Sequence, residues 1–245
     1  MMKPALLSIL FLFSCLAGAA DGQPVELHQQ LSLPAGAPDK VLALTLDACG
    51  GGFDAELATF LIEHRIHATI FATRIWIRRN AQGVAVLKAH ADLFDIEDHG
   101  ANHIPAVIGP DRSVYGLTGV ADLKQLKREV SGGAAAVKAM TGTAPHWYRG
   151  ATGEYDPEAL KSIEAMGYKV AGFSVNADNG ATLSKKQIVA RLKKVSNGDI
   201  IIAHFNRPAS DTGEGLAIGL KWLLDQGFRF VRLDGADVRL VQKRI

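Results

Sequence analysis

Apolar residues recur along the chain in two alternating patterns, short continuous runs and longer segments with helical spacing. The short runs are typical of buried strands and predict strands at residues 41–46, 67–73, 93–96, 147–149, 168–175, 199–203 and 229–233. The periodic segments predict helices at residues 54–65, 76–80, 82–90, 120–140, 156–166, 184–195 and 213–226. Strands that alternate with helices are typical of parallel β/α units. We therefore predict an α/β fold of parallel strands, a distorted (β/α) barrel, with a doubly wound open sheet as the alternative.

The first strand leads into Asp47 and then into three consecutive glycines, Gly50 to Gly52. In α/β folds the chemistry takes place at the carboxyl ends of parallel strands, so Asp47 is a candidate catalytic residue. The simpler interpretation is that Asp47 only caps a turn. The glycines also suggest a phosphate loop, but no Lys-Ser/Thr pair follows them.

Polar residues also follow the other predicted strands, and in a barrel they would converge at one mouth. They are His99 and His103, Arg149, Asn176 and Asp178, and His204. On a helical turn, the spacing of His99 and His103 would put both imidazoles on one face, as in a zinc half-site. Glu97 and Asp98 could orient the two rings from behind.

Several of these side chains have more than one possible role. Asp47 could be a metal ligand or the general base that takes a proton from metal-bound water. Arg149 could pair with Asp47 or bind substrate. His204 closes a very apolar strand and is either a satisfied core group or a catalytic acid. Cys49 could be a small buried filler, a soft metal ligand or a redox-sensitive thiol.

Composition and the N-terminal pattern indicate the compartment. The 245 residues carry a formal net charge of +2 without a basic block, so nucleic acid is not an expected partner. Residues 1–19 resemble a cleaved signal peptide, with a positive Lys3, an apolar core at 6–16 and small residues at 17–19. We expect residues 20–40 to be a loose leader and residues 41–245 to form the barrel. We expect the protein to be secreted or periplasmic, without a membrane span. Lipid anchoring at Cys15 is less favoured, because Phe13 is bulky for a lipoprotein signal.

Four motifs occur in a recognisable order. They are Thr45-Leu46-Asp47-Ala48, the His99 to His103 segment, Arg149-Gly150-Ala151-Thr152, and Ile202-Ala203-His204. In this order they resemble the motifs T-F-D-D, H-(S/T)-x-x-H, R-x-P-Y and L-x-H of the polysaccharide deacetylases, carbohydrate esterase family 4 with the NodB-like domain. The resemblance covers about residues 41–233 and implies a distorted (β/α) barrel that removes acetyl groups from an N-acetylated polysaccharide.

The resemblance also implies a role for each matching residue. A divalent metal ion, usually zinc in the family, would be held by His99 and His103, with Asp47 as a possible further ligand. Asp47 would be the base, His204 would protonate the leaving amine, and Arg149 would hold Asp47 in place. Backbone N–H groups at 148–155 could stabilise the oxyanion. Tyr148, Tyr155, Asn176 and Asp178 are candidate substrate-binding residues.

The chain departs from the family pattern at the same site. Ala48 replaces the second aspartate, a metal ligand, so that Asp47, Cys49 or Asp54 would have to supply the missing donor. Thr152 replaces an aromatic residue of the third motif. In a further motif of the family, between the third and the last, Asn176 and Asn179 stand in place of two acids, and Asp178 is the only acid nearby. The main prediction is a deacetylase acting on peptidoglycan or an exported glycan. The alternatives are a glycan-binding homologue without catalysis, an O-acetyl esterase and a purely structural barrel.

Overall fold

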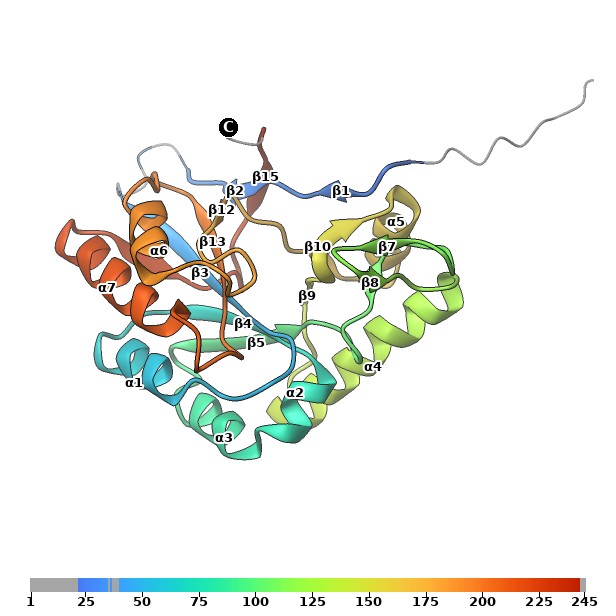
Figure 1. Ribbon diagram of the computed structural model, residues 1–245, viewed down its shortest axis with the longest axis horizontal. Helices are drawn as coiled ribbons and strands as arrows, with labels where there is room; N and C mark the ends of the chain where they lie inside the picture. Colours follow the sequence, from blue (N-terminus) through green and yellow to red (C-terminus); the bar gives the residue numbers. More distant parts are fainter. Residues whose placement is uncertain (1–21, 35, 37–39, 243–245) are drawn as a thin grey trace, which may run out of the picture.

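The computed structural model of the protein describes residues 22–34, 36 and 40–242, and its centre is a curved sheet of parallel strands (Figure 1). The strand order is β11-β9-β5-β4-β3-β13-β12, and β14 pairs with the start of β3. In that order the bounds are Lys169–Val170, Trp147–Tyr148, Phe94–Asp98, Ala68–Ala72, Val41–Ala48, Ile200–His204 and Val175–Asn176, with β14 at Arg229–Val231. The strands form a half-barrel with helices around it, which confirms the predicted fold class.

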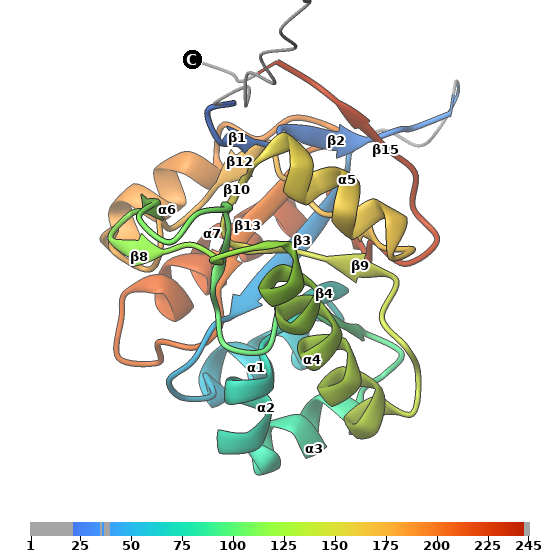
Figure 2. The ribbon, with the colours of Figure 1, turned by 90° about the vertical axis from the view of Figure 1, so that its right-hand side faces the viewer.

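The helices cover the outer face of this sheet, as two views at right angles show (Figures 1 and 2). They are α1 (Ala55–Glu63), α2 (Arg74–Arg79), α3 (Ala81–Ala89), α4 (Leu123–Thr141), α5 (Pro157–Ala165), α6 (Lys185–Leu192) and α7 (Thr212–Asp225). Capping side chains explain several of the starts: Asp54, Thr73 and Asp122 each accept a backbone N–H three residues later. Each predicted helix is present with its ends shifted by a few residues.

The central strand β3 separates two apolar layers, because successive side chains of a strand point to opposite faces. Its even-numbered residues, from Leu42 to Ala48, join the layer between the sheet and the helices. Val41 and Ala43 join the layer inside the half-barrel. All eight residues of the strand are buried, which explains why its sequence is an uninterrupted apolar run up to Asp47.

The segment expected to be a loose leader contributes strands instead, in the part of it that the structure describes. β1 (Val25–Glu26) pairs antiparallel with β10 (Ala151–Tyr155), and β2 (Gln29–Leu31) pairs antiparallel with β15 (Val238–Leu240). These short strands close the upper side of the half-barrel in Figure 1. The described residues ahead of Val41 are therefore part of the same domain, which the predicted boundary at residue 41 had excluded.

Three connections also differ from the sequence-based expectation. No strand was predicted between residues 149 and 168, and Ala151–Tyr155 forms strand β10, which bends at the positive φ angles of Thr152 and Gly153. The single strand expected at 168–175 is split into β11 and β12. The region 105–118 contains the short strands β6 (Pro105–Ala106), β7 (Ser113–Val114) and β8 (Leu117–Thr118). Strands this short lack the periodicity on which a prediction depends.

The predicted signal peptide at 1–19 and Cys15 lie outside the described residues. Among the helices that the structure describes, none has the length and apolar character needed to cross a membrane.

Candidate active site

The register of the parallel strands brings the polar strand ends to one edge of the sheet. His204 at the end of β13 is paired with Asp47 near the end of β3. Asp98, at the end of β5, is paired with Tyr148 of β9, so that His99 and Arg149 follow at the same edge. As expected for parallel strands, residues that are distant in sequence meet at the carboxyl ends.

Asp47 and Arg149 form a buried ion pair at this edge. The Arg149 Nη1 atom lies 2.9 Å from Asp47 Oδ1 and also donates to the hydroxyl of Thr45 at 2.9 Å. Its Nε and Nη2 atoms donate to the carbonyl oxygens of Ala171 and Gly172. Each nitrogen of the guanidinium thus donates a hydrogen bond within the protein, and Nη1 fixes one carboxylate oxygen of Asp47, while Oδ2 is not engaged by Arg149.

The charges around Asp47 keep it ionised although it is only 4% exposed. Burial alone would raise the pKa of its carboxyl, but the positive charge of Arg149, followed by those of His99 and His204, lowers it below the usual value. Asp47 is therefore a carboxylate that can accept a proton.

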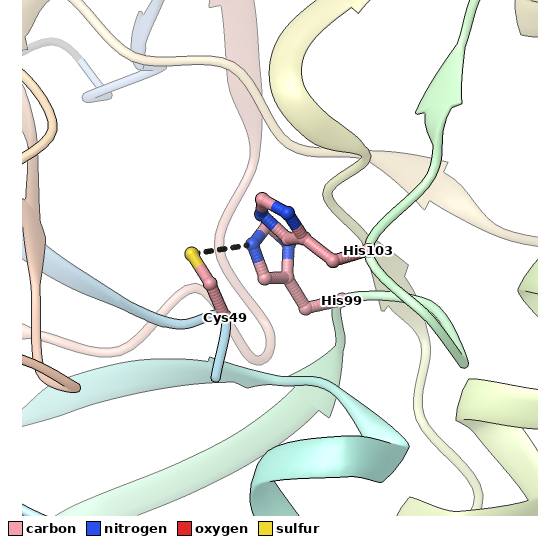
Figure 3. A group of neighbouring side chains, drawn as sticks. All are labelled: Cys49, His99 and His103. Carbon is pink, nitrogen blue, oxygen red and sulfur yellow. Dashed lines mark hydrogen bonds between the residues drawn. The ribbon is translucent and has the colours of Figure 1, made fainter. Parts of the chain in front are cut away.

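Cys49, His99 and His103 form a cluster of possible metal donors (Figure 3). The Sγ atom of Cys49 lies 3.4 Å from His99 Nε2, and the two imidazole centroids are 5.0 Å apart. The histidines do not lie on a helical turn, as the spacing had suggested: Gly100 and His103 have positive φ angles, and a tight loop brings the rings together. His99 Nδ1 is 2.6 Å from the carbonyl of Arg149, which accepts its hydrogen and leaves Nε2 directed at Cys49.

Glu97 and Asp98 do not orient the two histidine rings, so that prediction is wrong. Glu97 accepts the backbone N–H groups of His146 and Trp147, and burial is the main cause that raises its pKa to about 9. Asp98 accepts the backbone N–H of Gly100 at 2.8 Å. Both carboxyls hydrogen-bond to backbone N–H groups near the site and not to the imidazole rings.

A residue that sequence reasoning missed, Glu129 of α4, holds the loop between the two histidines. Its carboxylate is 2% exposed and accepts the backbone N–H groups of Asn102 at 2.7 Å and Ile104 at 3.2 Å. The helix approaches closely at Gly133, where a Cβ atom would collide with Asp98. No sequence signal distinguishes Glu129, because a carboxylate on an amphipathic helix ordinarily faces solvent.

His204 is paired with Asp178 on the other side of Asp47. Its Nδ1 atom lies 3.0 and 3.2 Å from the two oxygens of Asp178, which also accept the His204 backbone N–H and the hydroxyl of Thr212. Burial opposes protonation of His204, but its hydrogen bond to Asp178 raises its pKa well above the usual value. Asp178 is fully buried and paired with His204, so the substrate contact predicted for it is wrong.

The charges in the cluster of donors stabilise one another. Burial alone would raise the pKa of Cys49, but the charge of His99 and hydrogen bonds from the surrounding histidines lower it well below the usual value. Burial likewise opposes the charge on His99, and the negative charges of Asp47 and Cys49 raise its pKa to about 9. Cys49 is therefore neither an inert filler nor isolated from the site.

The other predicted substrate-binding residues have structural contacts. Tyr148 and Tyr155 are fully buried, and the hydroxyl of Tyr155 accepts the backbone N–H of Gly150. Neither ring is open to stack on a sugar, which corrects the prediction. The side-chain oxygen of Asn176 accepts the backbone N–H of Asn179 in a turn, so its acceptor is already engaged.

Part of the backbone segment expected to stabilise an oxyanion is also engaged within the fold. The N–H groups of Arg149, Gly150 and Gly153 donate to Asp98, Tyr155 and Gly150 respectively. Those three donors are used within the fold and are not available to a reacting carbonyl.

The cluster of Cys49, His99 and His103 fits a transition-metal ion. Each residue contributes one donor atom, and the three atoms lie within 4.8 Å of one another. A thiolate with imidazoles is a donor set that zinc favours, and three protein ligands leave a fourth position open, as in catalytic zinc sites. Asp47 Oδ2, 3.8 Å from His99 Nε2, lies beside the same cluster.

Comparisons with known proteins agree with this fold. A family model described as polysaccharide deacetylase matches residues 35–171. No curated protein matches the chain.

Among solved structures, a CE4 family pseudoenzyme from Bacillus anthracis is similar at 18% identity and a TM-score of 0.63, over 84% of this chain and 67% of the other. The Bc1960 peptidoglycan N-acetylglucosamine deacetylase is similar at 20% identity and a TM-score of 0.65, over 83% and 90%. A family 4 acetyl xylan esterase from Clostridium thermocellum, in complex with a cobalt ion, matches at 20% identity and a TM-score of 0.64, over 80% and 89%.

Proposed function

The chain belongs to the polysaccharide deacetylase family, and on that premise we propose that it is a metal-dependent hydrolase that removes acetyl groups from an N-acetylated polysaccharide. Peptidoglycan or an exported glycan is the substrate class that we propose. The observation that carries the proposal is the arrangement around Asp47, an ionised carboxylate between a cluster of metal donors and the His204–Asp178 pair.

The ion would be held by His99 and His103, together with donors from the end of β3, and zinc is the metal that this donor set favours. When bound, it would polarise the acetyl carbonyl and make a water molecule acidic enough to be deprotonated near neutral pH. The carbonyl of Arg149 fixes the direction of His99, because it accepts the hydrogen on Nδ1, so that Nε2 is the nitrogen that would bind the ion after losing its own proton.

Asp47 would act as the general base. Arg149 holds Oδ1, so the proton from the attacking water would go to Oδ2, the oxygen that faces His99. The buried guanidinium keeps the carboxylate ionised before the reaction and prevents it from rotating. Arg149 is thus a positioning residue, because it acts through Asp47.

His204 would act as the general acid. Its Nδ1 hydrogen is held by Asp178, so Nε2 is the atom that would give a proton to the leaving amine. The pair supplies a protonated imidazole at neutral pH, because the carboxylate of Asp178 stabilises the positive charge. One proton is taken from water at Asp47 and one is given up at His204, so hydrolysis yields acetate and a free amine.

Export would bring the enzyme to such substrates. We propose that the protein is secreted or periplasmic, supported by the signal-like composition of residues 1–19.

Two other functions have specific support. The similarity to a pseudoenzyme, together with Ala48 in the first motif, favours a glycan-binding protein without catalysis. The similarity to an acetyl xylan esterase favours hydrolysis of an O-acetyl ester at the same centre.

The test is acetate release by the zinc-supplemented full chain from chitin oligosaccharides, peptidoglycan fragments and O-acetylated xylan. The matched control is Asp47→Asn, which keeps the size of the side chain and removes the base. We expect release from an N-acetylated substrate by the wild type and a loss of roughly 100-fold or more in the control. Release from xylan alone would support the esterase. Glycan binding without release from any substrate would support the non-catalytic protein.

A further inference from the structure

The side chain of Ala48 is directed away from the donor cluster. Strand β3 continues through this residue, so its side chain points to the face opposite that of Asp47. Ala48 is fully buried in the apolar layer beneath the helices, together with Leu57, Ala72 and Trp76. A carboxylate at position 48 would enter this apolar layer instead of reaching the two histidines.

The sulfur of Cys49, in contrast to the side chain of Ala48, lies beside the histidines. It is the first residue after β3, and Figure 3 shows its sulfur pointing at His99. Asp54, another acid of this segment, is engaged elsewhere, since its carboxylate caps α1 at the N–H of Leu57. Position 49 is therefore the place on this segment from which a side chain reaches both histidines.

The spacing of the donor atoms is also that of a metal site. With zinc bonds of about 2.3 Å to sulfur and 2.0–2.1 Å to nitrogen, tetrahedral geometry separates sulfur from nitrogen by about 3.6 Å. The observed separation between Cys49 Sγ and His99 Nε2 is 3.4 Å, and the third donor, on His103, lies within 4.8 Å of both. A small closing movement of His103 would complete the set.

We propose that Cys49 supplies the third metal ligand as a thiolate, so that this protein has a Cys-His-His centre in which position 49, and not position 48, provides the ligand from this segment. The inference deepens the proposed function, on which it rests for the presence of the metal. A thiolate is a soft ligand, so the site should favour zinc or cobalt over magnesium or manganese, which a carboxylate would serve better.

The experiment uses cobalt as a spectroscopic probe in the full chain. Because cleavage of the predicted signal peptide would remove Cys15, the probe protein is the full chain with residues 1–19 retained, in which Cys15→Ser and Cys49→Ser form a matched pair of variants. We expect the wild type and Cys15→Ser to bind one equivalent of cobalt with the intense near-ultraviolet absorption of a cobalt–thiolate bond. Cys49→Ser should lose that absorption and bind zinc more than about 100-fold more weakly, since even indirect partners of a ligand contribute 10- to 100-fold.

Two further variants keep the test informative if Cys49→Ser folds poorly. Cys49→Asp should bind cobalt without the thiolate absorption, because a carboxylate at this position still faces the histidines. Ala48→Asp should lower the melting temperature and leave the thiolate absorption of any folded protein unchanged. Stoichiometric cobalt without thiolate absorption in the wild type would overturn the proposal, as would the absence of metal binding, which would indicate a metal-free ion pair between Cys49 and His99.

The result is distinguishable from that of the acetate assay. A thiolate-bound cobalt without acetate release would sustain the ligand assignment and contradict the proposed function. Metal-dependent acetate release without a thiolate signal would support the proposed function and contradict the assignment of Cys49 as a ligand.

Discussion

His99 and His204 lie on opposite sides of β3 in the strand order, and the structure fixes their rings with different partners. His99 Nδ1 faces the backbone carbonyl of Arg149 at 2.6 Å, whereas His204 Nδ1 faces the carboxylate of Asp178 at 3.0 Å. A carbonyl orients an imidazole without bringing a formal charge, while a carboxylate also stabilises the protonated ring. This difference in partners suits the two roles that we propose for the same residue type, a metal ligand on one side of Asp47 and a proton donor on the other.

The backbone around the two histidines differs in the same way. The loop that contains His103 is held by the buried Glu129, whose contacts fix backbone N–H groups and not the rings. On the other side, Asp178 binds both the ring and the backbone N–H of His204. The position of His103, on the side proposed to bind metal, thus depends on the shape of its loop. The position of His204, on the side proposed to donate a proton, depends on the single carboxylate of Asp178.

The largest effects should come from removing each histidine in turn. We expect His99→Ala to abolish both zinc binding and acetate release, because the ring is a direct donor. His204→Ala should lower kcat by about 10²- to 10⁴-fold and keep the zinc, because only the proton donor is lost. Zinc content and kcat measured on the same samples check this. If His204→Ala also lost its zinc, the assignment of His99 to metal binding and of His204 to proton transfer would be wrong.

A milder change on the acid side is Asp178→Asn. The amide still occupies the space beside His204 but no longer stabilises the imidazolium, so we expect kcat to fall by roughly 10- to 100-fold, as for a lost hydrogen bond to a charged group. Zinc affinity should not change. Steady-state kinetics with a chelator titration would show both, and an unchanged kcat would argue against His204 as the acid.

On the metal side, Glu129→Ala should weaken zinc binding by roughly 10-fold with little direct effect on the proton transfers. The reason is that the N–H groups of Asn102 and Ile104 lose their acceptor, so the loop no longer holds His103 in place. The control is Arg128→Ala on the exposed face of the same helix. Equal zinc affinity of the two variants would show that Glu129 does not support zinc binding.

The smallest predicted effect is on stability. With free zinc at about 100 times its Kd, binding contributes about 2.7 kcal/mol, which corresponds to roughly 5–10 °C in Tm for a chain of this size. Removing the metal from the wild type and from His204→Ala should lower Tm by similar amounts, whereas His99→Ala should not respond. Differential scanning fluorimetry with and without chelator measures this, and a response of His99→Ala would indicate zinc bound elsewhere.

Much of the fold could be predicted from the sequence, because parallel strands buried on both faces leave a strong local signal. The run before Asp47 and the apolar run that ends at His204 are both present as strands, and their carboxyl ends meet as parallel register requires. The short strands β1, β2 and β10 were not predicted, since their pairing depends on partners far away in the chain. Their sequences contain neither alternation nor long apolar runs.

The candidate site was predictable in its members and less so in its contacts. Asp47, His99, Arg149 and His204 are brought together, because each follows a strand of the same sheet. The sequence does not reveal that Asp178 belongs to His204 or that Tyr148 is buried. Those contacts depend on side-chain directions, which only the folded backbone determines. The expected helical turn at His99 failed because a spacing of four residues also fits a tight loop.

In the proposed reaction Asp47 and the bound metal act together, and acetate release during removal and return of the metal measures this dependence. The full chain would be assayed on an N-acetylated oligosaccharide as prepared, after chelation, and after addition of one equivalent of zinc, beside Asp47→Asn. We expect that release stops on chelation, returns with zinc in the wild type, and stays near background in the variant. Wild-type rates in Asp47→Asn, or full activity after complete chelation, would contradict this expectation.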